Sequence, residues 1–130
     1  MPGRALATEV GGGLQAAVVG VGVRLGLDVR REVKVGRRLW GSERRIDVVL
    51  TQRESRRSLG IECKFQGTKG TAEEKLPATI ADIAAWPIPG LVVFAGEGFS
   101  PNMRSYLYST GKAVELDDLE GWLKLYFGLD

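Results

Sequence analysis

The sequence contains a run of five consecutive apolar residues, Leu91 to Ala95. A short apolar run next to proline and glycine is typical of a strand that is covered on both faces. The chain is therefore expected to pack helices against a sheet. Because 130 residues is a usual length for one domain, residues 1–130 are predicted to form a single domain.

Three segments before this run alternate apolar and polar residues, as half-buried strands do. They are Val29–Val35, Ile46–Leu50 and Leu59–Phe65. The polar stretches between them, residues 36–41 and 51–58, are sized for hairpin connections. Because strand side chains alternate between faces, Ile46, Val48 and Leu50 are predicted to share one face.

Apolar spacing and capping signals predict four helices. The first covers residues 6–26, the second starts near Pro77, the third starts at Ser100-Pro101, and Asp117 with Glu120 caps the last. The buried stripe of the second helix is predicted to be Leu76, Ile80, Ile83 and Ala84. With a short strand over residues 114–116, the order is helix, three strands, helix, strand, helix, strand, helix. This order predicts an α/β fold with a mixed central sheet flanked by helices.

Composition excludes several kinds of chemistry. The chain has no histidine, which excludes Ser-His-Asp and Cys-His catalysis and histidine-ligated zinc. Its single cysteine, Cys63, excludes an internal disulfide and a multi-cysteine zinc site. Any metal would be a hard cation held by carboxylates. The apolar run over residues 10–23 is too short and too rich in glycine to span a bilayer, so an intracellular protein without membrane contact is expected.

The charge distribution says more than the net charge of +2. Basic residues crowd residues 30–57, while residues 115–130 are acidic. Such a basic zone suits a polyanionic partner, although a solvated face of charged strands and turns is the alternative. The basic residues of the zone are Arg30, Arg31, Lys34, Arg37, Arg38, Arg44, Arg45, Arg53, Arg56 and Arg57.

One strand segment carries the chemistry, Ile61-Glu-Cys-Lys-Phe-Gln66. Strand alternation directs Glu62, Lys64 and Gln66 to one face, and charged groups in such a row are costly unless they line a cleft. A hairpin with the preceding strand would bring Asp47 beside Glu62. Two carboxylates there suit Mg²⁺, and the backbone carbonyl of Cys63 lies close enough to add a ligand. Alternatively, Glu62 and Lys64 form an ordinary exposed cross-strand face.

The segments Ile46-Asp-Val-Val-Leu50 and Ile61–Gln66, in this order of elements, resemble the PD-(D/E)XK nuclease superfamily. The superfamily's restriction endonuclease-like core has the order αβββαβ, as do Holliday junction resolvase-like members. The resemblance implies that Asp47 and Glu62 bind metal and that Lys64 is the catalytic lysine. Gln66 matches a glutamine of many members, and Glu9 is the best-placed residue for their helix glutamate. The usual proline before the aspartate is absent, because Ile46 stands there.

The resemblance implies a Mg²⁺-dependent DNA endonuclease, with Mn²⁺ as a substitute, that cuts phosphodiester bonds. Because a DNA duplex has two strands to cut, a two-fold homodimer with two sites is the expected assembly. Resolvase-like, homing and restriction-type nucleases share this core. The alternative is a non-catalytic nucleic-acid-binding module that keeps the fold. Trp86 is predicted to lie in the core, and Trp40 is a candidate for nucleic-acid contact. The residues expected to contact DNA phosphates are Arg37, Arg38, Arg44, Arg45, Lys69 and Lys75.

Overall fold

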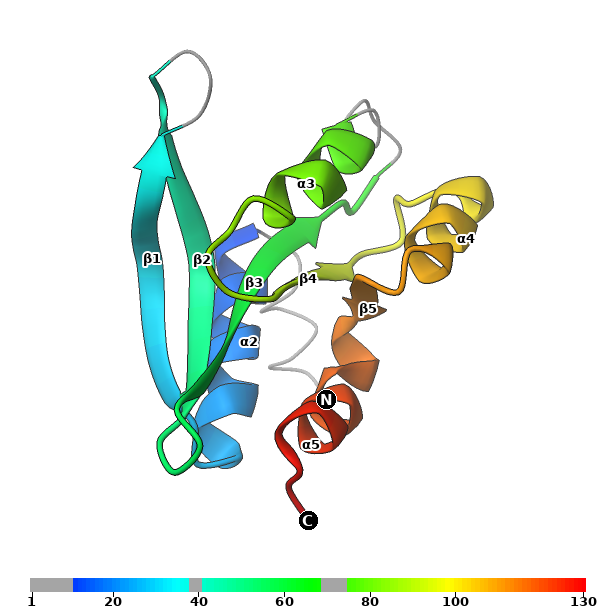
Figure 1. Cartoon of the computed structure of the whole chain (residues 1–130). Coiled ribbons are helices and arrows are strands. Elements are labelled where there is room, and N and C mark those ends of the chain that lie inside the picture. The colour runs from blue at the N-terminus through cyan, green and yellow to red at the C-terminus, as the bar shows by residue number, and fades with distance from the viewer. Residues whose placement is uncertain (1–10, 38–40, 69–74) are drawn as a thin grey trace.

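The computed structural model describes residues 11–37, 41–68 and 75–130. These residues form a five-stranded sheet with helices on both faces (Figure 1). The elements follow the predicted order, so the α/β fold with a mixed sheet is confirmed. The strands are β1 (Asp28–Arg37), β2 (Glu43–Gln52), β3 (Arg57–Phe65), β4 (Gly90–Ala95) and β5 (Ala113–Glu115). The helices are α2 (Gly11–Arg24), α3 (Leu76–Ile83), α4 (Pro101–Ser109), the 3₁₀ turn η2 (Leu116–Asp118) and α5 (Leu119–Phe127).

The sheet combines an antiparallel and a parallel half. β1, β2 and β3 form an antiparallel meander, and β3, β4 and β5 pair in parallel. α3 connects β3 to β4, so the carboxyl ends of these two strands meet at one edge of the sheet. β4 lies between β3 and β5, and its residues Leu91 to Phe94 have no exposed surface. The prediction of a strand covered on both faces is confirmed.

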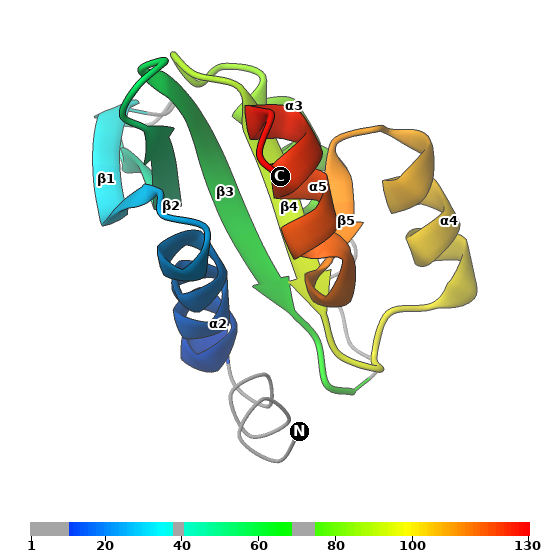
Figure 2. The ribbon, with the colours of Figure 1, turned by 90° about the horizontal axis from the view of Figure 1, so that it is seen from below.

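The helices divide between the two faces of the sheet. α2 and α5 pack on one face of the sheet (Figure 2). Leu14, Val18, Leu119 and Leu123 are completely buried there. α3 and α4 pack on the other face, where Trp86 is only 6% exposed, as its predicted core position requires. The longest described helix, α2, has 14 residues, and no candidate membrane span is found among the described residues.

Two details of the predicted helices are wrong. α3 begins at Leu76 with Pro77 in its first turn, as expected, but it ends at Ile83. Ala84 is therefore an exposed C-cap and not part of the buried stripe. The turn η2 displaces the start of the last helix, so the N-cap of α5 is Asp118 and not Asp117.

The two faces of β2 exchange sides along the strand, so that residues two positions apart contact different layers of helices. Val48 and Leu50 pack in the core beside α2, whereas Ile46 packs in the core beside α3. Residues two apart in a regular strand share a face, so the strand turns over at the intervening residue, Asp47. The prediction that Ile46 and Val48 share a face is wrong for this reason.

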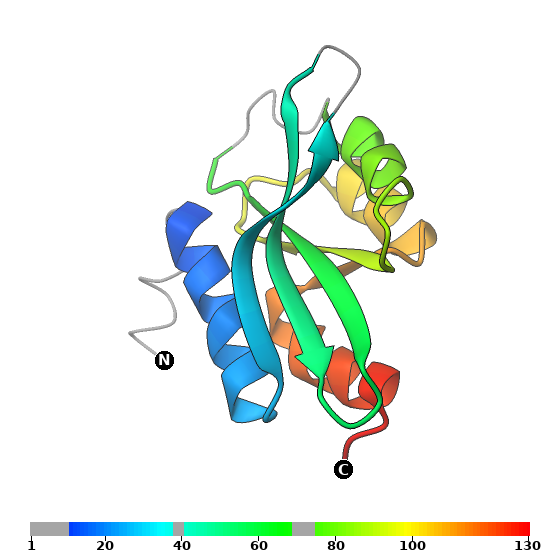
Figure 3. The same ribbon diagram turned by 60° about the vertical axis from the view of Figure 1, so that its left-hand side comes forward.

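β1 turns over at the matching position. Val29 packs on the α2 side, whereas Val33 packs on the α3 side. Between them Glu32 has a φ of 51°, a left-handed conformation that is uncommon outside glycine. Val33 still pairs with Ile46, so the two strands keep their register through the turnover. Figure 3 shows the strong twist of this long hairpin.

The packing of Trp86 on the sheet depends on glycine at position 60. A Cβ on Gly60 would lie 2.7 and 2.8 Å from two ring atoms of Trp86. We expect Gly60→Ala to lower the free energy of unfolding by about 1–3 kcal/mol, the usual cost of overpacking a core. Urea denaturation followed by circular dichroism measures this change.

Gly121 provides the matched control for this substitution. It lies within α5, and a Cβ there would meet no atom of the described residues within 4 Å. Alanine favours a helix interior over glycine by about 0.5–1 kcal/mol, so Gly121→Ala is expected to raise stability slightly. Equal effects of the two substitutions would contradict the role assigned to Trp86 packing.

Candidate active site

Asp47 lies where β2 and β3 separate. The two strands pair from Gln52, opposite Arg57, to Val48, opposite Ile61. This pairing does not extend to Asp47, the residue that precedes Val48 in β2. The Asp47 side chain enters the gap, where its Oδ2 accepts a hydrogen bond of 2.8 Å from the backbone N–H of Cys63. A carboxylate group has two oxygens, so this contact orients the group and leaves Oδ1 for another partner.

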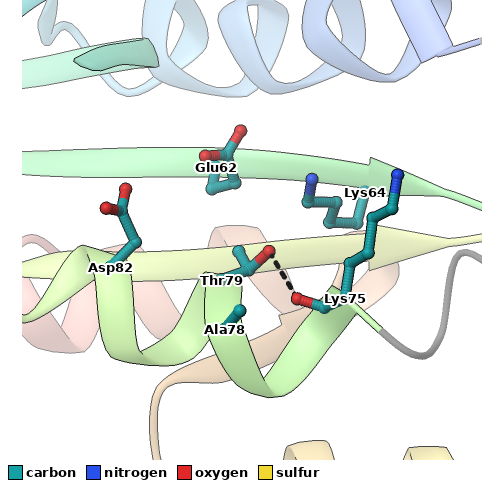
Figure 4. Close-up of a pocket in the computed structure, with 6 residues that line it drawn as sticks. All are labelled: Glu62, Lys64, Lys75, Ala78, Thr79 and Asp82. Carbon is teal, nitrogen blue, oxygen red and sulfur yellow. Dashed lines mark hydrogen bonds between the residues drawn. The ribbon is translucent and has the colours of Figure 1, made fainter. Parts of the chain in front are cut away.

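Glu62 and Lys64 lie on β3 on either side of Cys63 and are both half-buried. They line a pocket of about 400 Å³ between β3 and α3. Figure 4 shows this wall of the pocket facing Thr79 and Asp82 of α3 and Lys75, the N-cap of that helix. Glu62 and Lys64 therefore line the same cleft.

Cys63 does not contribute a reactive thiol. It is half-buried and packs against the core on the α2 face. Burial raises the pKa of its thiol well above the ordinary value, and the negative charges of Asp47 and then Glu62 act in the same direction. Because the thiolate is the nucleophile of cysteine chemistry, this thiol stays protonated and inert.

The wall that α3 contributes contains two residues that sequence reasoning missed, Thr79 and Asp82. Thr79 donates a hydrogen bond of 3.1 Å to the backbone carbonyl of Lys75 (Figure 4). Asp82 accepts a hydrogen bond of 3.2 Å from Arg44 of β2, and both side chains are 20% exposed. Lys75, Thr79 and Asp82 are spaced by four and three residues, a spacing that places them on one side of a helix. That spacing was the available signal.

Gln66 has a different setting from Glu62 and Lys64. It follows the end of β3, is 6% exposed, and is not among the residues that line the pocket. Its Nε2 donates a hydrogen bond of 2.8 Å to the carbonyl of Gly98. Within the described residues, its Oε1 has no hydrogen-bond partner. The observed contact joins the end of β3 to the loop after β4.

Of the predicted phosphate-binding residues, the structure describes Arg37, Arg44, Arg45 and Lys75. Lys75 lines the pocket and is exposed. Arg44 is paired with Asp82, and Arg45 donates a hydrogen bond of 2.8 Å to Glu43, whose pKa is lowered by Arg45 and then by Lys34. Arg37 is exposed and donates a hydrogen bond to the carbonyl of Gly41.

Four other predicted residues lie outside the described residues, namely Arg38 and Lys69, the candidate helix glutamate Glu9, and Trp40.

The chemistry of this donor set fits a hard divalent cation. The described residues contain no group of three or more histidine, cysteine, aspartate or glutamate side chains that could hold a metal alone. Mg²⁺ does not require one, because it usually keeps several waters and binds one or two carboxylates together with substrate phosphates. Asp47, already oriented by Cys63, and Glu62 supply two carboxylates of the required kind.

A mixed sheet with a carboxylate at the strand separation and a Glu-x-Lys strand beside it is the arrangement that the sequence resemblance predicts for a nuclease-like fold. The family model described as "PD-(D/E)XK nuclease superfamily domain" matches residues 3–121. The chain therefore belongs to the PD-(D/E)XK nuclease superfamily, as its sequence motifs indicated. No curated protein matches it.

Two solved structures are similar to this chain. The protein of unknown function AF1548 has a TM-score of 0.53 and 20% identity, and the match covers 78% of this chain and 55% of that one. Protein VC1899 from Vibrio cholerae has a TM-score of 0.49 and 17% identity, with 88% and 31% covered. The chain thus spans about half the length of the first and a third of the second. The likeness to AF1548 shows a shared fold.

Proposed function

We propose that this chain is a DNA endonuclease that hydrolyses phosphodiester bonds with Mg²⁺, for which Mn²⁺ can substitute. The observation that carries the proposal is the hydrogen bond from the Cys63 N–H to Asp47. It holds a carboxylate in the gap between β2 and β3, next to the strand that carries Glu62 and Lys64. Membership of a nuclease superfamily supports nucleic acid as the substrate.

Each residue of the site has a role in this proposal. Asp47 and Glu62 would hold the cation, together with the backbone carbonyl of Cys63. When bound, the cation would supply Lewis-acid polarisation of the phosphate and activation of water. Lys64 would orient the attacking water and stabilise the negative charge that develops on the phosphate. Lys75, on the opposite wall of the pocket, would neutralise a neighbouring phosphate of the same DNA strand.

The proposed assembly is a homodimer, because a duplex has two strands to cut and a two-fold dimer presents two sites. Two exposed apolar side chains support this proposal, namely Val23 of α2, which is 62% exposed, and Leu125 of α5, which is 86% exposed. The proposed specificity is for DNA structure, as in a junction resolvase, with a homing or restriction-type enzyme as the alternative.

A cleavage panel tests the proposal. The purified chain is incubated with linear duplex, single-stranded, flap and four-way-junction DNA, in Mg²⁺, in Mn²⁺ and in EDTA. We expect metal-dependent cleavage that EDTA abolishes, and preference for the junction would identify a resolvase-like enzyme. Binding without cleavage of any substrate in either metal would instead identify a non-catalytic nucleic-acid-binding module.

DNA binding is expected to weaken with salt, and Lys75 to account for one phosphate contact. Each such contact contributes about 0.9 to the slope of log affinity against log salt. Lys75→Ala should therefore lower the slope by about one unit, to a similar extent for unrelated sequences. Fluorescence anisotropy between about 50 and 200 mM salt, a range in which such contacts are visible, measures the slope.

The matched control for Lys75 is Lys124, which lies on α5 and pairs with Glu120. Lys124→Ala should leave the slope unchanged, because α5 covers the face of the sheet opposite α3. An affinity that does not change with salt would remove nucleic acid as the partner.

A further inference from the structure

Gln15 of α2 makes a contact that ties this helix to the candidate metal ligand. Its Nε2 donates a hydrogen bond of 2.8 Å to the backbone carbonyl of Asp47, and this contact is partly buried. Asp47 is the residue at which β2 turns over and leaves the ladder with β3. The contact therefore supports the backbone at the point where pairing with β3 ends, between Ile46 and Val48, which both pair with β1.

The orientation of the Gln15 amide is determined by its other neighbours. Its Oε1 accepts a hydrogen bond of 3.0 Å from Arg31 of β1, so the amide nitrogen must face the other way. The same nitrogen lies 3.4 Å from Oε1 of Glu32, the residue at which β1 turns over. One amide thus joins α2 to the turnover positions of both strands.

Together with the Cys63 contact, this gives Asp47 two fixed points. The Cys63 N–H holds its carboxylate, and Gln15 holds its backbone carbonyl. Groups that orient a metal ligand typically change metal affinity or activity by about 10- to 100-fold when they are removed.

We infer that Gln15 is a positioning residue for the metal ligand Asp47, acting through the hydrogen bond from its Nε2 to the Asp47 carbonyl. The inference rests on the proposed function, in which Asp47 holds the cation. Gln15 is assigned no contact with the metal or with DNA. Its amide nitrogen is the essential group.

Two isosteric substitutions test this assignment. Gln15→Glu keeps the length of the side chain and an acceptor for Arg31, but a carboxylate has no N–H to donate. Gln15→Met keeps the length and removes both hydrogen bonds. Both variants are expected to bind Mn²⁺ about tenfold more weakly or worse. If position 15 instead held the metal directly, Gln15→Glu would bind it as well as or better than glutamine.

Gln52 is the matched control, because its Nε2 also donates to a backbone carbonyl, that of Phe127, at 3.2 Å in a partly buried contact. Free Mn²⁺ is measured by electron paramagnetic resonance during titration of wild type, Gln15→Glu, Gln15→Met, Gln52→Met and Asp47→Asn. Circular dichroism and thermal unfolding establish that each variant is folded. Cleavage rates over the same Mn²⁺ range give the kinetic counterpart, in which saturating Mn²⁺ should restore most of the rate of the Gln15 variants.

The inference predicts weaker Mn²⁺ binding for both Gln15 variants and wild-type binding for Gln52→Met. Wild-type or tighter binding by Gln15→Glu, or equal weakening by Gln15→Met and Gln52→Met, would overturn it. If the wild type binds no Mn²⁺, or Asp47→Asn binds as the wild type does, the proposed metal site itself fails, and the inference fails with it. The variants therefore separate the two failures.

Discussion

Replacing Asp47 by asparagine should leave a folded protein that no longer cuts DNA. Asparagine keeps the shape of the side chain and an oxygen that can accept the hydrogen bond from Cys63. It loses the negative charge that would hold the cation. Glu62→Gln makes the equivalent change on β3. We expect each substitution to slow single-turnover cleavage by at least about 10²-fold, the scale for losing a positioned electrostatic group in an active site.

The matched control for these carboxylates is Asp28→Asn. Asp28 lies at the start of β1, where it pairs with Arg53 at 2.7 Å, away from the pocket. This variant should cut at the wild-type rate, and all three should bind DNA similarly in EDTA. Near-normal Mg²⁺-dependent rates in Asp47→Asn or Glu62→Gln would remove those residues from the metal site.

Lys64→Met separates a nuclease from a strand that merely holds a cation. Methionine keeps much of the length of the side chain but has no positive charge beside the phosphate. Metal affinity should persist or rise slightly, because a cation next to the carboxylates is removed. The chemical step should slow by about 10²-fold or more, as expected for loss of a positioned acid–base or electrostatic group. Single-turnover cleavage at saturating Mg²⁺, together with a metal titration, measures both quantities.

Lys75→Met is the natural comparison, since Lys64 and Lys75 line opposite walls of one pocket. It should weaken DNA binding and leave the single-turnover rate of bound DNA nearly unchanged. If Lys64→Met behaves in the same way, both lysines act in binding, and the chemical role assigned to Lys64 is wrong.

Local patterns predicted most of the fold because the local and the tertiary preferences of those segments agree. The apolar run of β4 is buried on both faces, and Pro77 occupies the first turn of α3 as its missing N–H allows. The turnover of β1 and β2 could not be predicted in this way. It depends on a left-handed Glu32 and on two cores that receive side chains from one strand, and both are properties of the assembled sheet.

The candidate site could likewise be predicted only in part, namely where a local pattern carries the residue. Glu62 and Lys64 were predicted from their alternation on one strand, and Asp47 from its position between two apolar residues. The α3 wall with Thr79 and Asp82, and the contact from Gln15 to Asp47, arise between elements that are distant in the sequence. The separation of Gln15 and Asp47 by 32 positions carries no periodic signal.

The joint turnover of β1 and β2 sets the smallest unit of this site that could be moved to another scaffold. A designer who grafted only the Glu-x-Lys strand would transfer Glu62 and Lys64 without the strand separation that admits Asp47. A one-residue deletion in β1 ahead of Glu32 would shift its turnover relative to that of β2 and exchange the faces of the residues between them. The unit to transfer is therefore the β1–β2 hairpin, β3 and the turn of α2 around Gln15. Any change in the length of β1 or β2 must be matched by the same change in the other strand.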